Sequence, residues 1–133
     1  MLSLLFQIGA ERYALDGQAV VEVVPRVRLD SVPGAPEWMP GILRYRGRRV
    51  PVADLSVLAG LPPCPVRLST RIILVRHPSA RDGRLLGLVA ERVTDAARGA
   101  GPAGCPVCVD ALVPPHVLTR IFSDDEPPAN AAR

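Results

Sequence analysis

One stretch of the 133-residue sequence decides the fold, and it reads Gly41-Ile42-Leu43-Arg44-Tyr45-Arg46-Gly47-Arg48-Arg49-Val50-Pro51-Val52-Ala53-Asp54-Leu55. Within it, short runs over 42–45 and 49–52 carry the apolar, aromatic and β-branched residues that favour strands. The Arg46-Gly47-Arg48 segment between them predicts a tight turn, with Gly47 available for a positive φ angle. The stretch therefore predicts a β-hairpin.

Signals for a short helix over 54–60 follow the hairpin directly. Asp54 can accept backbone N–H bonds as the N-cap, and Gly60 suits the left-handed position after the last turn. Pro62-Pro63 then prevents the helix from continuing. No second carboxylate or histidine is placed nearby in the sequence, so Asp54 is interpreted as a helix cap and not as a catalytic acid.

The residues before the hairpin predict three more strands. Apolar side chains recur with a period of two over 4–8, the chain turns over 9–12, and 13–15 reads as the return strand. The β-branched run over 20–24 favours a third strand, preceded by a single helical turn.

The residues after the helix predict two strands and then lose regular pattern. The strands are the apolar runs over 72–75 and 85–89, and the second is expected to extend to Val93. Small residues, Gly and Pro dominate 96–106, which predicts a loop, and a weak helix is expected over 113–122. We therefore interpret 1–122 as a single domain and 123–133 as a disordered polar tail.

The composition excludes several classes of protein. Hydrophobic residues make up 48% and charged residues 22%, which is ordinary for a soluble globular chain. All sixteen basic residues are arginines, but they are scattered among acids and the net charge is only +3, so no nucleic-acid partner is expected. No apolar run approaches the ~20 residues of a spanning helix. A cytoplasmic protein without membrane insertion is predicted.

The three cysteines do not form a disulfide framework, because they are odd in number. Cys105-Pro106-Val107-Cys108 is a lone Cys-x-x-Cys without the strand-then-helix setting of a redox motif. A zinc site would need two more ligands, and the remaining candidates Cys64, His77 and His116 have no familiar zinc spacing. No metal, cofactor or catalytic residue is expected. A small metal- or thiol-dependent protein built around Cys105 and Cys108 stays as the least favoured alternative.

Four segments, in order and spacing, resemble the CheW-like family of chemotaxis coupling proteins. The stretch 41–55 is similar to the family's pattern of Gly, apolar strand residues, Arg-Gly, Pro-Val and Asp-Leu. The other three segments are 6–15 with its Tyr-x-Leu ending, 20–24 with Val-x-Glu-Val, and 87–93 with Glu91 at the acidic place. The resemblance covers about residues 4–95. The Tyr-Arg-Gly and Leu-Ser-Thr-Arg sequences, at 45–47 and 68–71, are also similar to segments of adaptors of Wsp-type surface-sensing pathways.

This resemblance implies a mainly β fold of two small SH3-like, five-stranded β-barrels that carry no active site. It implies a scaffold coupling chemoreceptors, which are methyl-accepting proteins, to a CheA-type histidine kinase. The second barrel would engage the regulatory domain of the kinase, and the groove between the lobes would take the cytoplasmic tip of the receptor. The chain would then lie in the cytoplasm, held at membrane receptor arrays by these partners.

The sequence departs from the family after Thr94, where a closing hairpin, a strand and a short helix are expected. These elements are either strongly diverged or truncated. If they are missing, the first barrel has an open strand edge. The second hypothesis is therefore a truncated CheW-like domain that keeps one interface and acts as a regulator or competitor.

The resemblance also selects candidate partner-binding residues. We expect Arg46 to pair with Glu22 and shape the binding surface, whereas the alternative is a solvated surface pair worth ~0–1 kcal/mol. Gly47 would act indirectly, through the position of Arg46. Apolar candidates are core residues by default, or they line a groove, and the sequence alone does not separate the two. The complete set is Val20, Glu22, Arg46, Gly47, Val50, Leu88 and Glu91.

Overall fold

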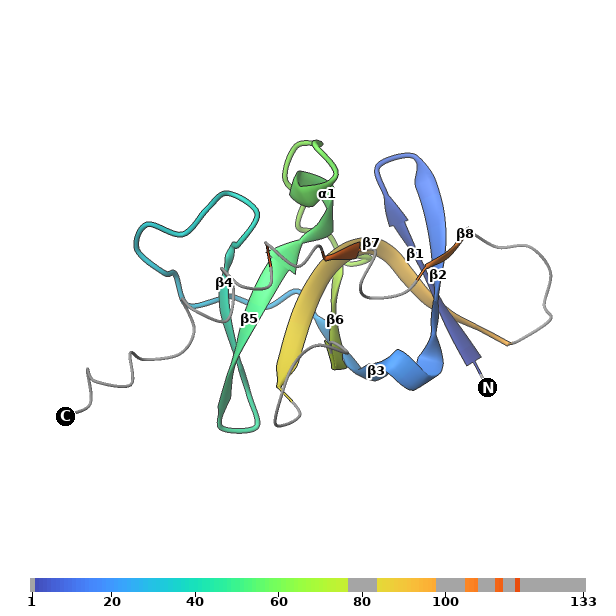
Figure 1. The fold of residues 1–133 in the computed structure, drawn as a ribbon, viewed down its shortest axis with the longest axis horizontal. Coiled ribbons are helices and arrows are strands. Elements are labelled where there is room, and N and C mark those ends of the chain that lie inside the picture. The colour runs from blue at the N-terminus through green and yellow to red at the C-terminus, as the bar shows by residue number, and fades with distance from the viewer. Residues whose placement is uncertain (1, 77–83, 98–104, 108–111, 114–116, 118–133) are drawn as a thin grey trace.

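The computed structural model describes residues 2–76, 84–97, 105–107, 112–113 and 117 (Figure 1). Strands dominate this part of the chain, which confirms the mainly β fold. The elements in order are β1 (Leu2–Ile8), β2 (Glu11–Asp16), the 3-10 turn η1 (Gly17–Ala19), β3 (Val20–Pro25), β4 (Gly41–Tyr45), β5 (Arg48–Asp54), α1 (Leu55–Leu58), β6 (Arg71–Arg76), β7 (Leu85–Ala97) and β8 (Cys105–Val107).

The long strand β7 organises the whole sheet (Figure 1). Its first half pairs antiparallel with β6 and parallel with the end of β5, and its second half pairs antiparallel with β1. The register with β1 shifts between Leu5 and Gln7, close to Arg92, which has a φ of 50°. Such a bulge bends a strand and increases its twist. One strand thereby passes from one group of strands into the other.

The side chains of the shared strands alternate between two cores. In β6, Ile73 and Val75 join the first core, whereas Ile72 and Leu74 join the second. The first core is completed mainly by β1 and β2, and the second by β4 and β5. We call the strands around these cores the first and second lobes. Because β6 is buried on both faces, its sequence reads as a continuous apolar run and not as an alternating one.

Gly87 permits close packing in the shared part of the sheet. A Cβ atom at this position would lie 2.9 Å from Cγ2 of Ile72 and 3.0 Å from Cγ2 of Val52. A glycine inside a strand often marks such a close approach of neighbouring groups. The absence of a side chain at Gly87 therefore lets β5 and β6 pack tightly against β7.

Local sequence signals located the hairpin and the helix correctly. Asp54 caps α1, since its carboxylate accepts hydrogen bonds from the backbone N–H groups of Ser56 and Val57. Gly60 follows the helix with a φ of 84°, as its predicted role requires. The helical turn before β3 is also confirmed, as η1. The first turn is tighter than the predicted 9–12, because Glu11 and Arg12 already pair with β1.

The prediction of a loop over 96–106 was wrong at both ends. β7 continues to Ala97, and Cys105–Val107 forms β8, which pairs parallel with Tyr13–Leu15 of β2. This pairing joins residues about ninety positions apart, so no local pattern could indicate it. It also covers part of the β2 edge.

Several predictions fall wholly or partly outside the described residues. The tail over 123–133 lies outside them, and of the helix expected over 113–122 only Val113 and Val117 are described, both buried in the first core. Five strands, β3 to β7, pair around the second core. A five-stranded first barrel stays a prediction.

Candidate functional site

The turn between β4 and β5 consists of only two residues, Arg46 and Gly47. Both have positive φ angles, 51° and 77°, the backbone geometry of the tight hairpin turns that match strand twist. The sequence indicated this conformation for Gly47 but not for Arg46. No atom lies within 4 Å of a Cβ atom built at Gly47, so the turn extends into open space. It carries the Arg46 side chain with it.

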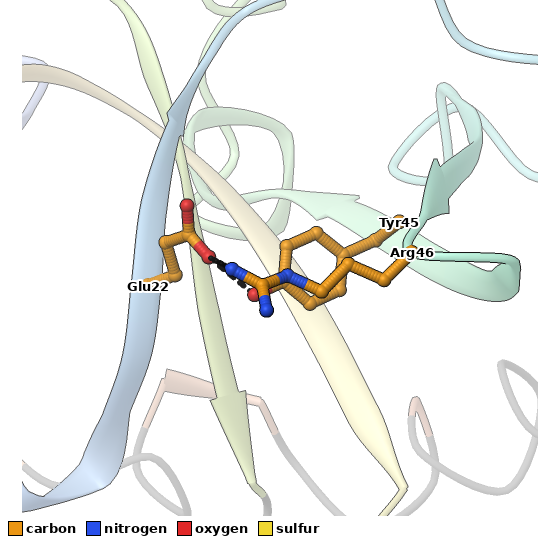
Figure 2. A network of polar contacts seen from close by, with 3 residues as sticks. All are labelled: Glu22, Tyr45 and Arg46. Carbon is orange, nitrogen blue, oxygen red and sulfur yellow. Dashed lines mark hydrogen bonds and ion pairs between the residues drawn. The ribbon is translucent and has the colours of Figure 1, made fainter.

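A three-residue polar cluster connects this turn to β3 (Figure 2). The hydroxyl of Tyr45 donates a hydrogen bond to Oε1 of Glu22, and Nη2 of Arg46 lies 3.4 Å from the same oxygen. The guanidinium carbon of Arg46 lies 5.3 Å from the centroid of the Tyr45 ring. One carboxylate oxygen of β3 thus receives two donors from the end of the hairpin. The expected contact between Arg46 and Glu22 is confirmed.

The charged groups of this cluster lie at the protein surface, where solvent weakens their attraction. The side chains of Arg46 and Glu22 are 74% and 40% exposed, and exposed ion pairs contribute little to folding. The hydrogen bond to the Glu22 carboxylate raises the pKa of Tyr45, with the charge of Arg46 acting in the opposite direction. The cluster is therefore a defined arrangement of charge that remains available to another molecule.

Tyr45 is the residue that the sequence analysis missed. Its ring packs against the second core while its hydroxyl reaches Glu22. A signal was present, because an aromatic residue at the end of a strand commonly buries its ring and leaves its hydroxyl free to bond. The tyrosine therefore fixes the carboxylate that Arg46 approaches.

A second ion pair lies on the same hairpin. Nε of Arg44 is 2.6 Å from Oδ2 of Asp30, and both side chains are exposed. The backbone of Asp30 is fixed as well, because it exchanges two hydrogen bonds with Ile42 of β4. Arg48 and Arg49 are also exposed, so the hairpin presents four arginines in six residues.

A family model described as the CheW-like domain matches residues 3–99. The chain belongs to the CheW-like domain family. The match confirms the resemblance drawn from the sequence and spans the strands from β1 to β7 with the whole Glu22–Tyr45–Arg46 cluster.

Individual relatives agree with this assignment. The chain is 30% identical over 93 residues to the chemotaxis protein CheW of Helicobacter pylori, covering 70% of this chain and 54% of that protein. It is 31% identical over 72 residues to protein PilI of Pseudomonas aeruginosa, covering 54% of this chain and 40% of that protein. The CheW-like chain thus spans about half the length of the curated relatives it matches. The Wsp-type assignment stays a prediction.

A solved structure confirms the CheW-like fold. The crystal structure of the scaffolding protein TtCheW from Thermoanaerobacter tengcongensis superposes with a TM-score of 0.63 at 31% sequence identity. The match covers 72% of this chain and 60% of that one. Both the fold class and the family therefore rest on independent comparisons.

Two of the apolar candidates cannot line a binding groove in this CheW-like chain. Val50 is 1% exposed in the second core and Leu88 is 0% exposed in the first. Their side chains contact only the protein interior, so the default interpretation as core residues was the correct one. Val20 differs, because it is only half-buried at the border of the first core.

Glu91 does not join the Glu22 cluster. It follows Ala90, which pairs with Arg71 at the start of β6, and its own partner in the sheet is Gln7. Its negative charge contributes to the raised pKa of Cys64. Glu91 therefore lies at the end of the second lobe that is remote from the β4–β5 turn.

The cysteines give no sign of a chemical centre in the part of the chain that the structure describes. Cys64 is a free, buried thiol whose pKa is raised to about 11, first by burial and then by the charges of Asp54 and Glu91. That shift disfavours the reactive thiolate. Cys105 lies in β8, and Cys108, His77 and His116 fall outside the described residues. Among the described residues, no group of three or more His, Cys, Asp and Glu side chains is placed to hold a metal.

The helix α1 has only four residues. No helix among the described residues is both long and apolar enough to cross a bilayer.

Proposed function

We propose that this CheW-like chain is a non-enzymatic scaffold in a chemotaxis-type signalling pathway. In this role it couples the cytoplasmic tip of a chemoreceptor to the regulatory domain of a CheA-type histidine kinase. It acts in the cytoplasm and is held at receptor arrays through these two partners. Membership of the CheW-like family supports the role, and the relatives described as chemotaxis and scaffolding proteins support it further.

The Glu22–Tyr45–Arg46 cluster carries the proposal. A guanidinium offers several donors in a fixed plane, which suits carboxylate and carbonyl groups on another protein. Only one contact of Arg46 with Glu22 is close, at 3.4 Å, and the arginine is 74% exposed. Most of its hydrogen-bonding face is therefore open to a partner, while Tyr45 and Glu22 fix where it lies. Gly47 contributes by allowing the turn that presents it.

Binding measurements on the purified chain test the proposal. The probes are the kinase regulatory domain and a receptor cytoplasmic fragment from the same genome, titrated by calorimetry. Arg46→Ala should weaken one of the two interactions by about tenfold or more, because exposed arginines at interface centres are frequent hot spots. Arg44→Ala is the matched control, since it removes an exposed arginine of the same hairpin that is paired with Asp30.

A double-mutant cycle tests whether Glu22 and Arg46 act together. Glu22→Ala, Arg46→Ala and the double variant should show coupled losses of binding, whereas strictly additive losses would contradict a shared role. Binding to neither probe by the folded wild-type chain would overturn the scaffold proposal. Binding to the kinase domain without the receptor fragment would favour the alternative of a regulator or competitor that keeps one interface.

A further inference from the structure

The loop between α1 and β6 carries most of the large apolar side chains that are exposed in the described residues. We define it as the apolar loop, residues 61–70. It holds three of the four large apolar side chains that are exposed in the described part of the chain: Leu61, Val66 at 68% and Leu68 at 92%. Pro62 and Pro63 are exposed beside them. Single exposed apolar residues are normal on a surface, whereas several within one loop are a feature that interaction sites commonly show.

The apolar loop is held in place by polar groups beneath it. The hydroxyl of Thr70, which is fully buried, donates to the carbonyl of Pro65 at 2.6 Å and accepts from the backbone N–H of Arg67 at 3.2 Å. The backbone N–H of Thr70 in turn donates to the carbonyl of Arg67 at 3.0 Å. The N–H of Cys64 donates to Oδ2 of Asp54 at 2.9 Å.

Arg71 adds a further support from the start of β6. Its guanidinium Nη1 donates to the carbonyls of Leu68 and Thr70. The backbone that carries Leu68 is therefore bonded from both sides. A contact surface that is ordered before binding loses less conformational entropy when a partner arrives. The exposed Val66 and Leu68 are thus presented on a framework suited to recognition.

The charge around the apolar loop indicates the chemistry of its partner. The loop contains no Asp or Glu and one exposed arginine, Arg67, and Arg71 lies beside it. The acidic groups Asp54 and Glu91 lie near the Cys64 side of the loop, where their charges act on the thiol. Two copies meeting loop to loop would bring these arginines together, so self-association is disfavoured. A partner with an apolar pocket and carboxylates at its rim would complement both features.

The apolar loop and the β4–β5 turn lie at opposite ends of the second lobe (Figure 1). β5 runs from Arg48 beside the turn to Asp54 beneath the loop. Seven residues of strand at ~3.3 Å each separate the two ends by roughly 20 Å. Two proteins can therefore occupy the two ends at the same time without competing for one surface.

We propose that the apolar loop is a second protein-docking surface, which inserts Val66 and Leu68 into an apolar pocket rimmed by carboxylates on a folded partner protein. This inference rests on the proposed scaffold function, because a coupling protein needs two separate surfaces. The Glu22–Tyr45–Arg46 cluster is one of them and the apolar loop is the other. Leu68 is the central contact, and Arg67 pairs with the acidic rim.

The test uses Leu68→Ser and the double variant Val66→Ser/Leu68→Ser in the full chain. Both positions are exposed, so neither change should lower the melting temperature appreciably. Val27→Ser is the matched control, since Val27 is a partly exposed apolar side chain outside the loop. Titration against the kinase regulatory domain and the receptor fragment should show about a tenfold loss for Leu68→Ser with one of the two probes. Arg46→Ala should affect the other probe.

The outcomes separate this inference from the proposed function. Wild-type affinity of the double variant for both probes overturns the apolar loop as a docking surface and leaves the scaffold function standing. A wild-type chain that binds neither probe overturns both. Charge reversal by Arg67→Glu should weaken the same interaction as Leu68→Ser, and an unchanged affinity there would contradict the acidic rim.

Two further measurements test whether a second copy of the chain or a membrane surface, and not a partner protein, binds the apolar loop. Size-exclusion chromatography that shows a wild-type dimer and a monomeric Leu68→Ser would assign the loop to a second copy and overturn the proposal. Co-sedimentation with phosphatidylserine vesicles that is lost in Leu68→Ser would assign it to a membrane surface, with the same consequence. The expected results are a monomer and no sedimentation.

Discussion

The two ends of the second lobe expose opposite kinds of side chain. At the β4–β5 turn the exposed groups are charged, and the ring of Tyr45 beneath them packs on the apolar core. At the apolar loop the exposed groups are apolar, and buried polar groups, Asp54 and Thr70, hold the backbone beneath them. The comparison teaches that, at the apolar loop, the side chains available to a partner are different from the groups that hold the backbone in place. There, residues that shape the surface and residues that would touch a partner are different and can be mutated independently.

The largest loss of stability is expected for Asp54→Ala, because the Asp54 carboxylate holds the backbone of α1 and of the start of the apolar loop. The carboxylate accepts N–H bonds from Ser56, Val57 and Cys64, and all three donors would lose their partner. Loss of a helix cap and an unsatisfied buried N–H together should lower the free energy of unfolding by about 3 kcal/mol. Urea denaturation measures this. Asp54→Asn keeps an acceptor oxygen and should lose less, and equal losses for the two variants would contradict the capping role.

The alkylation rate of the Cys64 thiol should report how well the folded protein protects the backbone of the apolar loop from solvent. Its pKa of about 11 lies two pH units above the ordinary value of 9.0, so the thiolate is populated about a hundredfold less at a pH of about 8. In a Cys105→Ser/Cys108→Ser protein, alkylation by iodoacetamide should be slower than in the urea-unfolded protein by at least this factor. Adding Asp54→Ala should accelerate the native reaction. Equal rates in the folded and unfolded chains would show that the apolar loop opens freely.

A smaller effect is expected at the other end, for Gly47→Ala in the β4–β5 turn. No side chain obstructs the new methyl group, so the change acts through the φ of 77° alone. A left-handed conformation at a non-glycine residue costs roughly 1–2 kcal/mol. Thermal unfolding should show that loss, and Gly47→Asn should recover part of it, because asparagine tolerates this region. A full loss in the asparagine variant would point to a cause other than backbone strain.

The smallest change concerns Tyr45, whose pKa is raised by its hydrogen bond to Glu22. Glu22→Gln removes the negative charge, so the Tyr45 ultraviolet titration should move to lower pH. A raised folded-state pKa contributes stability that is present below the ordinary value of 10.0 and is lost as the pH rises through the shifted pKa. Wild-type stability should therefore decline more steeply above that pH than the stability of Glu22→Gln. Identical titrations in the two proteins would contradict the hydrogen bond.

Local signals explain what could be predicted from the sequence. The β4–β5 turn and the capped helix α1 depend on Gly47, Asp54 and Gly60, each of which acts on its own neighbours. β8 could not be predicted, because its only partner in the described sheet is the distant β2. The division of the apolar strands into two cores was equally hidden, since it depends on which strands flank β6 and β7.

The candidate site was predicted in part for the same reason. The contact of Glu22 with Arg46 joins two segments that the family resemblance placed together, but Tyr45 was overlooked, although it lies beside Arg46. Val50 and Leu88 were kept as binding candidates beside their default place in the core, because apolar character does not distinguish the interior from a groove. The exposure of the apolar loop was not predicted, since Leu68 in a sequence looks no different from a buried leucine.

The strand shared by the two lobes has a mechanical consequence. β7 supplies backbone hydrogen bonds to β5 and β6 over its first half and to β1 over its second half. A force applied to one lobe therefore reaches the other through a covalent chain and not across a surface that can slide. The two lobes should melt in a single transition, and a cut between Ala90 and Val93 would separate β1 from its partner, the second half of β7. Because both lobes share this strand, they are expected to move together, with little change in the distance between their far ends.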